Sequence, residues 1–84
     1  MTPDEAAILT TLATNRRGLS STGIATQLRW YRESAIREYA RSPDEYRAYK
    51  ALLRLTRQGK VVQTMTGAGS RYKLSPQAAL SQRP

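Results

Sequence analysis

The stretch from Ser42 to Leu74 constrains the fold most, because a helix with a clear start and a clear stop is followed there by two short strands. The run Ser42-Pro43-Asp44-Glu45 supplies a hydroxyl acceptor, a proline with a fixed φ and a glutamate three residues after the serine. These residues form a capping box, which predicts that a helix begins at this point. Gly59 can adopt the left-handed conformation that ends a helix, so the helix should span residues 43–58.

Two faces of this helix carry different side chains. Apolar residues recur at helical spacing and are predicted to be buried, namely Tyr46, Tyr49, Leu52, Leu53 and Leu55. Cations recur on another face at i, i+3, i+7 and i+10, and we call them the basic stripe: Arg47, Lys50, Arg54 and Arg57. A solvated surface would have the same pattern, so the stripe alone does not identify a binding site.

After Gly59 the pattern changes from helical to extended. Val61, Val62 and Thr64 are β-branched, and the glycines at 67 and 69 allow the positive φ that a hairpin loop often needs. Alternation along the second strand predicts that Tyr72 and Leu74 point inward, whereas Arg71 and Lys73 point outward. The hairpin of residues 60–74 should therefore have a basic outer surface.

The first half of the chain contains two more helix starts. Thr2-Pro3-Asp4-Glu5 forms a second capping box and predicts a helix over residues 3–14. Asn15-Arg16-Arg17-Gly18 ends that helix, and Ser20 is placed to cap the next one, with Leu19 and Ile24 as a hydrophobic staple.

The segment between Leu28 and Ser42 allows two interpretations. Its apolar residues continue the helical spacing, so the second helix runs on to about Ala40 or breaks near Arg32 into a separate helix. A helix over residues 33–41 would present Arg37 and Arg41 and is a second candidate for a recognition helix. The aromatic residues between Trp30 and Tyr39 exceed what a small core can bury, which favours a homodimer contact through this region.

The order helix, glycine, hairpin resembles the winged helix-turn-helix superfamily, most closely in ALLRLTRQGKVV followed by RYKL. The earlier segment GLSSTGIATQL resembles the second helix of many such domains. This resemblance implies a mainly α fold with a small β-hairpin, in which three or four helices precede a two-stranded wing. We expect one domain over residues 1–75 and a partly disordered tail over residues 76–84.

Charge favours a polyanionic partner. The 84 residues include 14 basic and 6 acidic side chains, which gives a formal net charge of +8. Eleven of the cations are arginines; bidentate recognition of phosphate and guanine or GC-rich coding would each explain this bias. Without a histidine or cysteine the chain lacks the usual general base, thiolate and transition-metal ligands, so we expect no enzymatic activity, metal or cofactor.

The resemblance and the charge together predict a protein that binds double-stranded DNA, as a small dimeric regulator of transcription. Base contacts are predicted for Arg47, Lys50 and Arg54, and backbone contacts for Ser20, Ser21, Thr22, Arg57, Arg71 and Lys73. The alternatives are a module that docks an acidic protein, a replication or recombination accessory factor, and an RNA-binding factor. We expect a cytoplasmic protein, nucleoid-associated when bound to DNA, because no apolar run would span a membrane.

Overall fold

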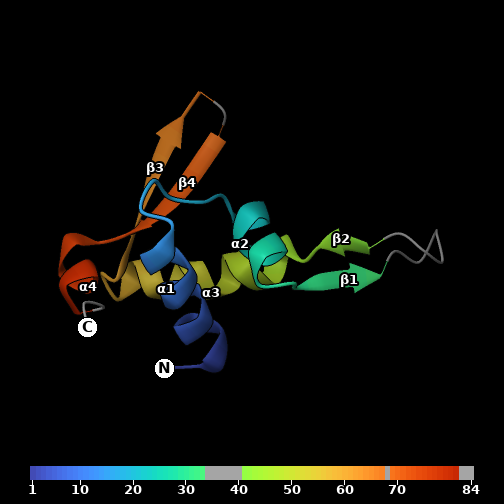
Figure 1. The fold of residues 1–84 in the computed structure, drawn as a ribbon, viewed down its shortest axis with the longest axis horizontal. Helices are drawn as coiled ribbons and strands as arrows, with labels where there is room; N and C mark the ends of the chain where they lie inside the picture. Colours follow the sequence, from blue (N-terminus) through green and yellow to red (C-terminus); the bar gives the residue numbers. More distant parts are fainter. Residues whose placement is uncertain (34–40, 68, 82–84) are drawn as a thin grey trace.

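The computed structural model describes residues 1–33, 41–67 and 69–81. Within them, a body of helices carries two antiparallel hairpins that project in different directions (Figure 1). In chain order the elements are α1 (Pro3–Thr14), α2 (Ser21–Gln27), β1 (Tyr31–Glu33), β2 (Arg41–Pro43), α3 (Glu45–Arg57), β3 (Val61–Thr66), β4 (Gly69–Leu74) and α4 (Pro76–Ser81). The expectation of a mainly helical chain with a small hairpin is confirmed at this level.

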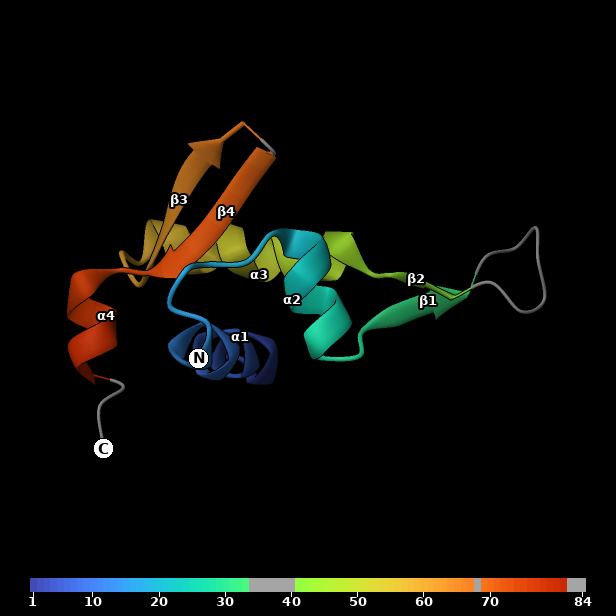
Figure 2. The same cartoon turned by 45° about the horizontal axis from the view of Figure 1, so that its top comes forward.

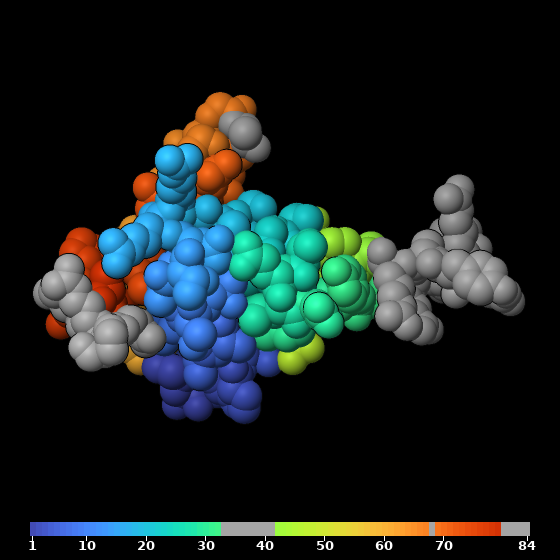
Figure 3. Space-filling model, viewed as in Figure 1, coloured from blue at the N-terminus to red at the C-terminus, as the bar shows by residue number. Residues whose placement is uncertain are grey.

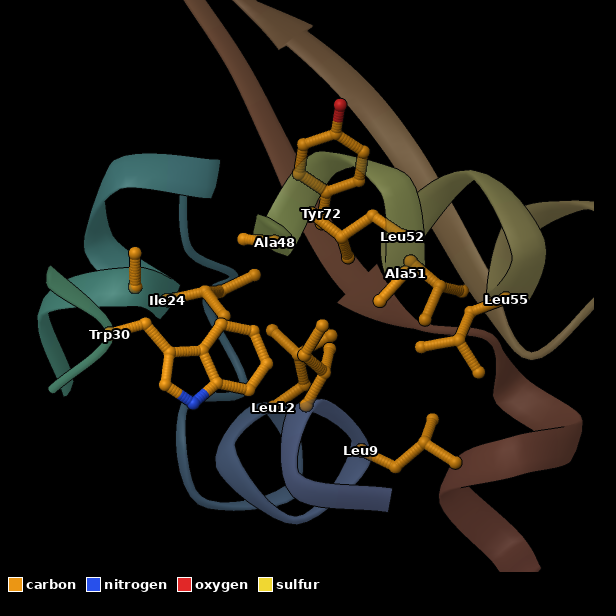
Figure 4. Close-up of a cluster of buried hydrophobic side chains, with 12 residues drawn as sticks. Leu9, Leu12, Ile24, Trp30, Ala48, Ala51, Leu52, Leu55 and Tyr72 are labelled. Atoms are coloured by element: carbon orange, nitrogen blue, oxygen red, sulfur yellow. The ribbon is translucent and has the colours of Figure 1, made fainter. Parts of the chain in front are cut away.

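The hydrophobic core lies between α1, α2, one face of α3 and the start of the β3–β4 hairpin (Figure 4). This core face of α3 consists of Ala48, Ala51, Leu52 and Leu55, all fully buried. Against it pack Ile8, Leu9 and Leu12 of α1, Ile24 and Ala25 of α2, Trp30, Val61 and Tyr72. The two alanines allow the other helices to approach α3 closely.

The predicted starts of α1 and α2 are confirmed. The Thr2 hydroxyl accepts a hydrogen bond from the Glu5 amide at 3.2 Å, and the Ser20 hydroxyl accepts one from the Gly23 amide at 3.1 Å. Each bond satisfies an amide that would have no partner within its helix. α1 also has the predicted bounds of residues 3–14.

The predicted continuation of the second helix is wrong. α2 ends at Gln27, and Arg29 takes the left-handed conformation with a φ of 58°. The Arg29 amide donates to Thr26 and the Trp30 amide to Ala25, which is a Schellman ending without a glycine. The chain then forms β1, which pairs with β2 in the register Tyr31 with Pro43 and Glu33 with Arg41.

This pairing also removes the second candidate for a recognition helix. Glu33 and Arg41, its predicted ends, are strand residues that face each other across the β1–β2 hairpin. Arg37, Tyr39 and Ala40 lie outside the described residues.

α3 begins two residues later than predicted. Ser42 pairs with Arg32 in the β1–β2 hairpin, and Asp44 takes over as the cap, accepting a hydrogen bond from the Arg47 amide at 3.1 Å. The predicted end is confirmed: Gly59 has a φ of 75°, with its amide bonded to Thr56 and the Lys60 amide bonded to Leu55.

The second hairpin follows at once. β3 and β4 pair from Val61 with Leu74 to Thr66 with Gly69, and Gly69 has a φ of 121°. A further bridge joins Leu19, in the loop before α2, to Tyr72 of β4 through two backbone hydrogen bonds of 2.8 and 3.0 Å. The hairpin is thus tied to the body on the α1–α2 side, as seen in Figure 2.

At the C-terminal end, the predicted tail is in part helical. α4 covers Pro76–Ser81, with the Ser75 hydroxyl accepting a bond from the Ala78 amide at 3.1 Å. Ala78 is buried, so this helix packs on the body. Within the described residues no helix has the length and apolar character needed to cross a bilayer.

Candidate nucleic-acid interface

The solvent side of α3 differs from the prediction. Because Ala48, Ala51, Leu52 and Leu55 face the core, Tyr46, Tyr49 and Leu53 are left exposed, with 63%, 43% and 39% of their surface accessible. Their assignment to the buried face is therefore wrong. Together with two cations they define what we call the outer face of α3: Tyr46, Tyr49, Lys50, Leu53 and Arg57.

Arg47 does not lie on this outer face. Its guanidinium donates two hydrogen bonds to the Asp4 carboxylate of α1, at 2.8 and 2.9 Å, and stacks over the Trp30 ring at 4.2 Å from the centroid. The hydrogen bonds from Arg47 lower the pKa of Asp4 from its ordinary value of 3.8. Arg47 thus joins α3 to α1 and to the base of the β1–β2 hairpin.

Arg54 is held in a similar way about two turns further along α3. Its Nε donates a 2.8 Å hydrogen bond to Glu5 Oε1, and the Gln58 amide lies 3.5 Å from the other carboxylate oxygen. The Glu5 side chain is only 4% exposed, whereas that of Arg54 is 45% exposed. The bond from Arg54 lowers the pKa of Glu5 from its ordinary value of 4.5, so the carboxylate stays ionised beside the core.

The four predicted cations of the basic stripe therefore fall into two pairs. Arg47 and Arg54 form what we call the α1-facing flank of α3, where acidic side chains engage them. Lys50 and Arg57 lie on the outer face and have no ion-pair partner among the described residues. The Lys50 ammonium stands 4.7 Å from the centroid of the Tyr46 ring. Of the predicted base contacts, only Lys50 is presented to solvent without a carboxylate partner.

The alternation predicted for the second strand is confirmed in part, because Arg71 and Tyr72 of β4 follow it whereas Lys73 is half-buried. Tyr72 is buried and Leu74 packs against the core, while Arg71 is exposed. Burial raises the pKa of Tyr72, and the phenol of Tyr49 adds a smaller effect in the same direction. Tyr72 is thus within electrostatic reach of Tyr49 on the outer face of α3.

Lys73 is fixed by a close approach of the loop that follows α1. A Cβ on Gly18, whose φ is 89°, would lie 2.8 Å from Lys73 Cγ and 2.9 Å from the Tyr72 carbonyl oxygen. The same loop carries Arg16 and Arg17, both exposed, and it protrudes beside the hairpin in Figure 3. On sequence these two arginines were interpreted only as part of a helix ending; they directly precede Gly18, which packs against Lys73.

Three residues at the start of α2 were predicted to contact phosphates, and two of them form hydrogen bonds within the protein. Ser20 caps the helix, and the Thr22 hydroxyl donates a 2.5 Å hydrogen bond to Glu45 Oε1 at the first turn of α3. Ser21 is half-buried and is the first residue of the helix. The Thr22 bond fixes α2 relative to α3.

The aromatic segment offered as a dimer contact is less exposed than expected. Trp30 is 9% exposed and belongs to the core, whereas Tyr31 is 43% exposed on β1. Tyr39 lies outside the described residues. The surplus of aromatic surface that motivated the dimer is reduced accordingly, and dimerisation stays a prediction.

The described residues contain no cluster of three or more His, Cys, Asp or Glu side chains that would hold a metal ion. No protein-family model, no curated protein and no solved structure matches the chain.

Proposed function

We propose that the protein binds double-stranded DNA as a winged helix-turn-helix domain, with α3 in the major groove and the β3–β4 hairpin against the backbone. One observation carries the proposal: the outer face of α3 is exposed in a chain of net charge +8, and within the part of the chain that the structure describes its two cations form no ion pair. Such a helix has the width that a major groove accepts.

The elements around α3 support this proposal. α2 precedes α3 in the chain and packs against it, and the β3–β4 hairpin directly follows α3. Leu19 pairs with Tyr72 of β4 through an isolated β-bridge, which adds a third short segment to the hairpin. The assignment of residues differs from that made on sequence. Lys50 and Arg57 are the cations proposed to enter the groove, Arg71 and Lys73 to hold phosphates, and Arg47 and Arg54 to stabilise the domain.

The proposal predicts salt-dependent binding of moderate steepness. Four cations directed at DNA give a slope of log K against log salt of roughly −3 to −4 per protomer. Fluorescence anisotropy with a random-sequence duplex over a range of salt concentrations measures this slope. A slope near zero would contradict the proposal.

A pair of matched lysine variants locates the surface. Lys50→Ala should reduce the magnitude of the slope by about one unit. Lys60→Ala removes the same charge at a site beside Met1, Leu9 and Ala78, away from the outer face, and should leave the slope unchanged. Equal effects of the two variants would place the binding surface elsewhere.

The alternative with a specific observation in its favour is a protein-docking module. The outer face exposes Tyr46 and Leu53, and Val62 on β3 is 40% exposed, so the surface has apolar area as well as charge. This alternative predicts no measurable binding to random-sequence duplex DNA at moderate salt.

A further inference from the structure

The outer face of α3 carries more hydrocarbon than charge. Tyr46, Lys50, Leu53 and Arg57 follow one another along the helix at spacings of four, three and four residues, and Tyr49 lies beside them. The two tyrosines and the leucine are each 39% exposed or more, in a domain whose other large apolar residues on α3 are fully buried. The outer face therefore combines three exposed apolar or aromatic side chains with two cations.

The chemistry of the major groove offers a match for this hydrocarbon. Guanine presents the N7 and O6 acceptors that arginine and lysine bind, whereas thymine presents a 5-methyl group that apolar side chains contact. From this complementarity we infer that the outer face recognises thymine methyl groups, with Leu53 and Tyr46 as the contacting side chains and Lys50 and Arg57 holding the flanking positions. The inference rests on the proposed function and specifies its substrate as A·T-rich duplex DNA.

Other occupants of this face fit less well. The ammonium group of Lys50 stands over one face of the Tyr46 ring, so a single-stranded base could not stack on that face. Duplex RNA lacks the methyl group and has a major groove too narrow for side chains to read. A second copy of the chain would bring two more cations to a face that already carries Lys50 and Arg57, which like-charge repulsion opposes.

The test removes only the methyl groups. Two duplexes of about two helical turns, both of A·T pairs in the same mixed order, differ in having thymine or uracil throughout. Base pairing and phosphate charge are unchanged. The wild-type chain should bind the thymine duplex more tightly, by roughly fourfold for each methyl group that becomes buried.

Protein variants assign the effect to side chains. Leu53→Ala and Tyr46→Ala should each reduce the ratio of the two affinities toward one. Met65→Ala truncates an apolar side chain of similar size that is 76% exposed on β3, and should leave the ratio at its wild-type value. All three positions are exposed, and circular dichroism verifies that each variant is folded.

The possible results separate the two claims. If both duplexes bind with the same salt dependence and the same affinity, the methyl inference is overturned and the proposed function stands. If neither duplex binds, both are overturned. If thymine is preferred equally by wild type, Leu53→Ala and Tyr46→Ala, the preference comes from DNA shape and the side-chain assignment is overturned.

Discussion

The α1-facing flank and the outer face of α3 carry cations of the same kind in opposite surroundings. Arg47 and Arg54 on the flank meet Asp4 and Glu5, and both form hydrogen bonds of 2.8 Å to a carboxylate. Lys50 and Arg57 on the outer face meet no carboxylate among the described residues. One helix therefore uses two of its four cations to attach itself to α1 and leaves two for a partner.

Charge on a helix therefore cannot be assigned to ligand binding from the helix alone. The first turn of α1 carries Asp4 and Glu5, where negative charge also favours the helix dipole. The same two residues reach α3, 43 and 49 residues further along the chain. An acidic helix start thus stabilises α1 and neutralises half of the cations of α3 at once.

Two adjacent leucines of α3 should differ most in their contribution to stability, because one lies in the core and the other on the outer face. Leu52→Ala removes a fully buried side chain and should lower the free energy of unfolding by about 2 to 5 kcal/mol. Leu53→Ala removes one that is 39% exposed and should cost about 1 kcal/mol or less. Urea denaturation of both variants measures the difference, and similar costs would show that the faces of α3 are wrongly assigned.

The arginines of the α1-facing flank and of the outer face should differ in their effect on the melting temperature, by less than the two leucines do in stability. Arg54→Ala should lower the melting temperature, because it leaves the buried Glu5 carboxylate without its guanidinium partner. Arg57→Ala should leave the melting temperature nearly unchanged and weaken binding to duplex DNA. The double variant Glu5→Gln/Arg54→Ala is the control: since the buried charge is gone, it should recover part of the loss. No recovery would mean that Arg54 acts by packing alone.

The pH dependence of stability tests the same flank without changing α3. Hydrogen bonds from the arginines lower the pKa of Asp4 and of Glu5 below 3.8 and 4.5. A carboxyl group whose pKa is lower in the folded state than in the unfolded state stabilises the fold at any pH above its ordinary pKa. This contribution is lost as the pH falls through the pKa of the folded state.

The free energy of unfolding should therefore be nearly constant between about pH 7 and 5 and should decline below about pH 4.5. Urea denaturation at a series of pH values measures it. In Glu5→Gln the free energy of unfolding should decline less steeply below about pH 4.5. The same decline as in the wild type would contradict the role given to Glu5.

Local signals in the sequence were sufficient for much of the fold. The caps at Thr2 and Ser20, the glycine ending at Gly59 and the alternation around Tyr72 each depend on residues within a few positions, and each was predicted. The stop of α2 was missed because a residue with a Cβ, Arg29, adopts the left-handed conformation that glycine usually supplies.

The candidate site was predicted less well, for two physical reasons. Tyr46, Tyr49 and Leu53 were expected in the core because they are large and apolar, yet the core face of α3 contains Ala48 and Ala51, whose small side chains let α1 and α2 approach. The partners of Arg47 and Arg54 lie on another helix, and helical spacing within α3 carries no information about them.

The smallest expected effect concerns the more exposed of the two ion pairs. In the Asp4–Arg47 pair the side chains are 30% and 46% exposed, so solvent screens the interaction even though it is bidentate. Asp4→Asn should therefore cost about 0.2 to 1 kcal/mol at low salt and less at high salt. Arg47 should keep its place over Trp30, because the ring contact does not depend on Asp4. Thermal unfolding at two salt concentrations, with Asp44→Asn as a control for charge at a helix start, measures the effect. If Asp4→Asn lowers the stability at high salt much more than Asp44→Asn does, the Asp4–Arg47 pair is shielded from solvent. The two ion pairs of the α1-facing flank would then be equally buried, instead of one being more exposed than the other.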